Sequence, residues 1–246
     1  MTDAAADRPI PNRILPLVRR HAEDAAFYWH QIDRSTESLH LRPPRLRHFD
    51  ALLAAHLEGL EIAGHDGLSC ARKALERWLK PGEAFVCAWL ALQLKDQPTL
   101  DALGRACVRT PDALLRGVIC ALSRLPFDTA GPCLAAWSSR QASPTPTVAA
   151  LRAVALIGRS ALEALGAPVA TFLEHPDAHV RAAACRAANE PACATALLAR
   201  LRDDDATVRA EAAIALGFTA GGDEAPAVLW RCILEQANRT EAATGW

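Results

Sequence analysis

A short phrase near the C-terminal end of the chain occurs twice in almost the same form. Residues 177–188 are DAHVRAAACRAA, and residues 205–216 are DATVRAEAAIAL. Aspartate, valine and arginine therefore return together after 28 residues (205 − 177). A period near 30 residues with this composition is typical of stacked helical hairpins, which bury their apolar faces only against neighbouring copies. The repeat predicts an all-α chain of the kind that binds macromolecules along an extended surface.

Weaker copies of the same apolar rhythm precede this pair. The anchor positions are Phe85, Leu115, Val148, Val180 and Val208, spaced by 30, 33, 32 and 28 residues. Two helices of about 11–12 residues with short turns fill this length. We therefore predict about five helical hairpins in an array over residues 81–238. Two prolines within residues 141–147 predict a loop in this array.

The first 80 residues do not show the repeat. Apolar positions in residues 49–60 and 68–79 follow the period of a helix instead. A solenoid needs a terminal cap, because its first repeat would otherwise expose an apolar face. We predict an N-terminal helical cap over residues 1–80 and a flexible tail over residues 239–246.

The repeated phrase resembles the HEAT-repeat family. This resemblance implies a right-handed α-solenoid of about five HEAT-like helical hairpins. In that family the turn aspartate and the following arginine tend to pair between neighbouring repeats. The resemblance thus implies a structural ladder made of Asp177, Arg181, Asp205 and Arg209.

A narrower resemblance rests on HAEDAAFYW at residues 21–29, AHLEGLEIAG at residues 55–64 and GEAF at residues 82–85. Together these segments resemble an uncharacterised proteobacterial HEAT-repeat family found near type VI secretion genes. That family has no agreed activity. Its genomic neighbourhood implies a role in effector handling or immunity.

Composition narrows the partner and the compartment. The net charge of −1 argues against a dedicated nucleic-acid binder. Residues 167–246 carry 7 basic and 11 acidic groups, a balance of −4, which predicts either a solvated face or a docking surface for a basic partner. Eight cysteines without a CxxC pair suit a reducing compartment. With no signal peptide and no apolar span, we expect a cytoplasmic protein that does not enter a membrane.

Motifs that would carry chemistry are missing from the sequence. It contains no HExxH, P-loop or nucleophile-elbow motif, so we expect no catalytic residue, no metal and no cofactor. His48 and His56 lie two helical turns apart, which is more typical of packed or surface histidines than of a catalytic pair. An enzyme such as a chromophore lyase or DNA glycosylase is the third hypothesis, and it would need a pocket near Trp89 or Trp137.

These observations favour a non-catalytic, protein-binding solenoid. The first hypothesis is a type VI secretion immunity protein that neutralises a secreted effector toxin, possibly a nuclease, in the cytoplasm. The second is an adaptor that loads an effector. The predicted partner-binding residues are polar positions of the repeats and the cap, namely Arg186, Asn189, Asp203, Asp204, Glu211, Glu58 and Glu61.

Overall fold

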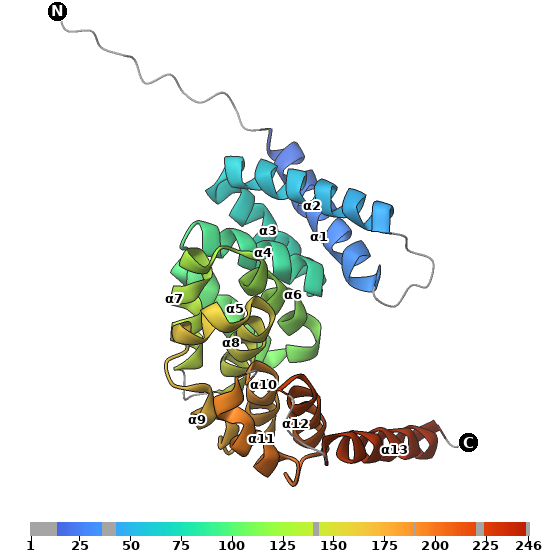
Figure 1. The fold of residues 1–246 in the computed structure, drawn as a ribbon. Coiled ribbons are helices and arrows are strands. Elements are labelled where there is room, and N and C mark those ends of the chain that lie inside the picture. Colours follow the sequence, from blue (N-terminus) through green and yellow to red (C-terminus); the bar gives the residue numbers. More distant parts are fainter. Residues whose placement is uncertain (1–13, 36–42, 140–142, 189, 220–223, 245–246) are drawn as a thin grey trace, which may run out of the picture.

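The computed structural model describes residues 14–35, 43–139, 143–188, 190–219 and 224–244. Every regular element in these residues is a helix, and the helices follow one another as packed pairs (Figure 1). Among the described residues, no helix combines the length and the apolar character needed to cross a membrane. The fold is an all-α solenoid, as the repeat predicts.

Five helix pairs form the body of the solenoid, and each anchor position of the sequence lies in the second helix of a pair. The first helices are α3 (His65–Trp78), α5 (Gln97–Arg109), α7 (Phe127–Ser138), α9 (Val169–Leu173) and α11 (Ala194–Arg200). The second helices are α4 (Pro81–Gln93), α6 (Pro111–Arg124), α8 (Pro144–Ile157), α10 (Ala178–Ala187) and α12 (Ala206–Thr219). The second helices contact one another in series and form a continuous row.

Three further helices lie at the ends of this body. Helices α1 (Leu15–Arg34) and α2 (Pro43–Ala63) pack on each other and on the first pair. Helix α13 (Ala225–Thr244) packs against α12 at the other end. It is helical through most of residues 239–246, where the sequence predicted a tail.

Two short 3₁₀ helices, η2 (Arg159–Ala164) and η3 (Pro191–Cys193), connect the later pairs. The loop predicted over residues 141–147 lies partly outside the described residues, and α8 already begins at Pro144. Proline is well tolerated there, because the first turn of a helix has no intrahelical partner for the missing N–H group.

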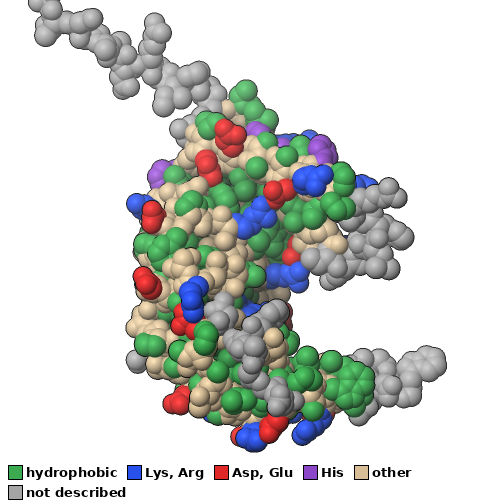
Figure 2. Space-filling model, in the orientation of Figure 1, with side chains coloured by type: hydrophobic (Ala, Val, Ile, Leu, Met, Phe, Trp, Pro, Cys, Tyr) green, Lys and Arg blue, Asp and Glu red, His purple; other side chains and the backbone are tan. Residues whose placement is uncertain are grey.

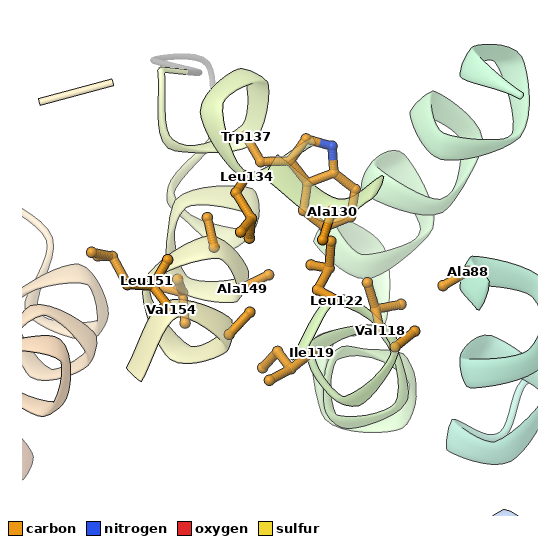
Figure 3. Packing of buried hydrophobic residues seen from close by; sticks show 14 of the residues in the cluster. Ala88, Val118, Ile119, Leu122, Ala130, Leu134, Trp137, Ala149, Leu151 and Val154 are labelled. Atoms are coloured by element: carbon orange, nitrogen blue, oxygen red, sulfur yellow. The ribbon is translucent and has the colours of Figure 1, made fainter. Parts of the chain in front are cut away.

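A single apolar core runs through the whole stack, from Val18 in α1 to Ala225 in α13. Figure 3 shows its middle section, with the buried side chains of Leu122 of α6, Trp137 of α7 and Leu151 of α8. Small residues let the second helices approach closely. At Gly117 of α6 an added Cβ atom would lie 1.9 Å from the carbonyl oxygen of Pro81, at the start of α4.

Candidate protein-binding surface

The row of second helices faces a hollow side of the molecule. Figure 1 places α7 and α9 on the outer side of the curve, while α6 and α12 lie toward the opposite side. Figure 2 shows that this opposite side is hollowed between the α1–α2 end and α13. We call the row α6, α8, α10 and α12 the inner wall.

Helices α1 and α2, which we call the cap from here on, cover the beginning of the row and are fastened to it by side chains. Arg116 of α6 donates to Asp33 of α1 at 2.6 Å, and Arg124 of α6 pairs with Asp50 of α2. The indole N–H of Trp29 in α1 donates to Cys120 Sγ of α6 at 3.3 Å. Because these bonds reach past the first pair to the second, the wall that stays open to a partner extends from α8 to α12.

The repeated aspartates cap the helices that follow them. Asp177 Oδ1 accepts hydrogen bonds from the backbone N–H groups of His179 and Val180, at 2.9 and 3.2 Å. Its counterpart Asp205 does the same for the two equivalent groups at the start of α12, at 2.8 and 3.1 Å. Each aspartate satisfies orphan donors and carries negative charge at the positive end of a helix dipole.

The repeated arginines make the contacts between repeats. Arg181 donates to both carboxylate oxygens of Asp203 at 2.8 Å, and to the carbonyl oxygens of His175 and Pro176 at 2.9 Å. The equivalent Arg209 donates to two turn carbonyls at 2.9 and 3.0 Å and to Glu235 of α13 at 2.8 Å. The cross-repeat acids are thus Asp203 and Glu235, and not the capping aspartates that the family resemblance implied.

Asp203, which we predicted as a partner-binding residue, is a structural residue. Its side chain is 4% exposed and also contacts Arg200 and the backbone N–H of Asp205. Burial alone would raise the pKa of Asp203, but the hydrogen bond from Arg181 and the nearby guanidinium charges hold it below its ordinary value. Both oxygens are engaged within the chain, so Asp203 does not offer a free carboxylate. Its neighbour Asp204 is exposed.

Two other predicted residues, Arg186 of α10 and Glu211 of α12, bind each other across the inner wall. Nε of Arg186 donates to Glu211 at 3.0 Å, and a terminal nitrogen of Arg186 binds the other carboxylate oxygen. The Arg186 side chain is 51% exposed, whereas that of Glu211 is 12% exposed. The pair lies on the inner wall with the arginine accessible. Asn189 lies outside the described residues.

The two predicted residues of the cap occupy its junction with the first pair. Glu61 accepts hydrogen bonds from the indole N–H of Trp89 at 2.6 Å and from the side-chain amide of Gln93 at 3.1 Å. Glu58 is exposed and lines a small cavity of about 140 Å³ beside Glu61 and Trp89. This cavity is smaller than the several hundred Å³ typical of ligand sites.

Sequence reasoning missed Arg152, which lies on α8 in the middle of the inner wall. Its guanidinium is partly buried, and among the described residues it makes no hydrogen bond or ion pair. Burial lowers the pKa of Arg152, Arg186 lowers it further, and Glu211 raises it. The repeat itself held a signal. Arg152 lies four residues after the anchor Val148, and the equivalent positions after Val180 and Val208 are alanines, Ala184 and Ala212.

The described residues do not gather side chains for a metal site, and several of their cysteines are buried. They contain no group of three histidine, cysteine, aspartate or glutamate side chains placed to hold a metal ion. Burial raises the pKa values of Cys87, Cys107 and Cys185 to about 12, which keeps these thiols protonated near neutral pH.

The aromatic and histidine residues weighed for catalysis are also engaged elsewhere. Trp137 is buried in the core. His56 does not pair with His48 but with His21, at 2.9 Å between their Nδ1 atoms, and it stacks on Tyr28.

Comparison with known proteins identifies the repeat. A family model described as HEAT repeats matches residues 167–245, from the turn before α9 to the end of α13. The match and the helical stack together support HEAT repeats over these residues, and HEAT repeats commonly bind other proteins. No curated protein and no solved structure matches the chain.

Proposed function

We propose that this chain is a non-catalytic scaffold that binds a protein partner along its inner wall. The open stretch of second helices from α8 to α12 carries the proposal, because it offers accessible apolar and charged side chains together. Leu156 of α8 is 66% exposed and Ile214 of α12 is 41% exposed. With Arg186 between them, these residues have the mixed composition of protein-binding surfaces.

Substitutions on the two sides of the solenoid test this proposal. Leu156→Asp and Ile214→Asp place charge on the inner wall without touching the core. Val108→Asp is the matched control, because Val108 is 43% exposed and lies on α5, a first helix that is not part of the inner wall. Proteins captured from cells by the full chain should be lost with the two wall variants and retained with Val108→Asp. Loss with Val108→Asp alone would place binding on the first helices and reject the inner wall.

The finer proposal is that the partner is a secreted effector toxin and that binding confers immunity. Its support is the resemblance to a family found near type VI secretion genes, together with a binding surface that needs no chemistry to block a toxin. An adaptor that delivers the same effector would use the same surface with the opposite outcome.

Co-expression separates immunity from delivery. A toxin-domain gene next to this one should arrest growth of a host cell, and this chain should restore growth. If growth stays arrested although the two proteins bind, immunity is rejected. If deletion of this gene stops secretion of the effector without self-intoxication, the adaptor role is supported instead.

The structure changes the expected chemistry of the partner. A basic nuclease was expected from the excess of acidic groups in residues 167–246. Several of those acids are held in ion pairs within the chain: Glu190 with Arg159, Asp203 with Arg181, Glu211 with Arg186, Glu224 with Arg202 and Glu235 with Arg209. Paired carboxylates offer little attraction to a basic protein. The charge of the expected partner therefore depends on the side chains of the inner wall that have no ion-pair partner within the described part of the chain.

A further inference from the structure

Arg152 is unlike the other arginines of the described residues. Four of these arginines are partly buried: Arg152, Arg181, Arg200 and Arg209. The last three bind carboxylates of the chain. A partly buried guanidinium loses hydration, and proteins normally compensate this loss with a paired carboxylate. Arg152 has no such compensation among the described residues, so its position costs the folded chain free energy.

Two positive charges lie close together around Arg152. Arg186 is a nearby cation, and among the described residues that act on Arg152 the nearby carboxylate is Glu211, which forms its two hydrogen bonds with Arg186. Glu211 thus pairs with Arg186 and leaves Arg152 without a bonded carboxylate among the described residues of the inner wall. Leu156 lies one helical turn beyond Arg152 on the same face of α8 and is 66% exposed.

We infer that Arg152 and Arg186 form a receptor for a carboxylate side chain of an acidic protein segment, with Leu156 and Ile214 contacting apolar side chains next to that carboxylate. This inference rests on the proposed function and names the chemistry of the partner. A planar guanidinium binds a carboxylate through two parallel hydrogen bonds. Arginine and apolar anchors side by side are typical of interface hot spots.

A nucleic-acid strand fits this wall less well. Phosphate binding depends on several free cations along a strand. The other wall arginines near the cap, Arg116 and Arg124, are already neutralised by Asp33 and Asp50. One uncompensated charge between exposed apolar side chains favours a protein segment.

Selection of short random peptides displayed on phage, with the full chain immobilised, tests this inference. The recovered peptides should carry aspartate or glutamate beside apolar residues. Arg152→Gln should weaken the affinity of the synthesised peptides by about 10-fold or more, the usual effect of losing a charge-assisted pair. Arg105→Gln is the matched control, because Arg105 is an exposed arginine of α5, and it should leave the affinity unchanged. Glu211→Gln should strengthen binding, because it frees Arg186.

The stability of the variant separates a binding role from a folding role. Arg152→Gln should keep or raise the midpoint of thermal unfolding, because it removes an uncompensated partly buried charge. A lower midpoint would show that Arg152 is a structural residue and overturn the inference.

Other outcomes overturn the inference while leaving the proposed function intact. The inference is overturned if the recovered peptides are basic, or if they are acidic but bind the Arg152→Gln variant with unchanged affinity. The proposed function remains if Leu156→Asp still abolishes the binding of those peptides. A single-stranded oligonucleotide that binds with the same dependence on Arg152 would identify phosphate as the ligand instead. If no peptide binds, or if binding survives every wall variant, both the inference and the inner-wall proposal are rejected.

Discussion

The contact between Arg181 and Asp203 makes the sharpest prediction about what holds neighbouring repeats together. Both side chains are largely buried, with 15% of Arg181 and 4% of Asp203 exposed. The guanidinium binds both carboxylate oxygens at 2.8 Å. Removal of one partner from a buried ion pair costs about 3–5 kcal/mol, because the other charge stays buried without compensation.

The two single substitutions should differ in size. After Asp203→Ala, Arg181 still donates to the carbonyl oxygens of His175 and Pro176, so we expect a cost near 3 kcal/mol, at the lower end of the range. Arg181→Met also removes those two bonds and should cost more. Asp204→Ala is the control, because this neighbouring aspartate is exposed, and it should change the free energy of unfolding by less than about 0.5 kcal/mol.

Hydrogen exchange should show where the stability is lost. Each repeat of a solenoid is stabilised chiefly by its neighbours, so Asp203→Ala should lower amide protection in α10, α11 and α12 while α1 and α4 keep theirs. Denaturant unfolding of the same variants gives the overall cost. Equal effects of Asp203→Ala and Asp204→Ala, or a uniform loss of protection from α1 to α13, would refute this reasoning.

The same pair predicts a pH dependence. The pKa of Asp203 is held below its ordinary value in the folded chain, so its contribution to stability is complete above the unfolded pKa of about 3.9 and is lost as the pH falls through the lower folded value. Asp203→Asn should therefore lower the unfolding midpoint strongly at pH 7 and much less at pH ~2. A difference that stays constant across this range would contradict the assignment.

Three further predictions concern packing, the cap and the thiols. Gly117→Ala should cost about 1–3 kcal/mol in chemical denaturation because its Cβ atom would overlap backbone, whereas Gly131→Ala, with its nearest contact at 3.6 Å, should be neutral or slightly stabilising. Burial lowers the pKa of His56, so the neutral ring is favoured in the folded cap, and amide protection in α1 and α2 should fall as the pH drops below about 6.5; His56→Gln should abolish this step. Cys87, whose pKa is raised to about 12 by burial, should resist iodoacetamide at pH 8 in the native chain and react after unfolding, and rapid native alkylation would contradict its burial.

The fold could be read from the sequence because each repeat carries its own signal. All five anchor positions lie in second helices, since the apolar rhythm that fills the core between pairs must recur with every repeat. The prolines of residues 141–147 misled the loop prediction, because the same residue type that breaks a helix interior is favoured in its first turn. Local sequence alone does not distinguish the two positions.

The candidate site was harder to predict because ion pairing is a property of three-dimensional neighbours. The sequence counts Glu211 and Asp203 as free acidic groups, yet Arg186 and Arg181 of the preceding repeat engage them. The turn aspartates were correctly singled out by their repetition, but the acid that meets each arginine lies 22 or 26 residues further along the chain and differs between copies. In the sequence, only one feature could have indicated the arginine of the inner wall that is unpaired among the described residues: Arg152 stands where the two later repeats have alanine.

The attachment of the cap has a mechanical consequence. Most repeats of the stack touch only the pair before and the pair after, so small rotations at successive interfaces can add up and change the curvature of the whole molecule. Helices α1 and α2 bypass this rule, because their side chains bind α4 and α6 at once. These bonds join the cap to the first two pairs at once, whereas the pairs from α8 onward contact chiefly their immediate neighbours. If a partner binds the inner wall as proposed, the uncapped end is the part of the solenoid whose curvature can adjust to it.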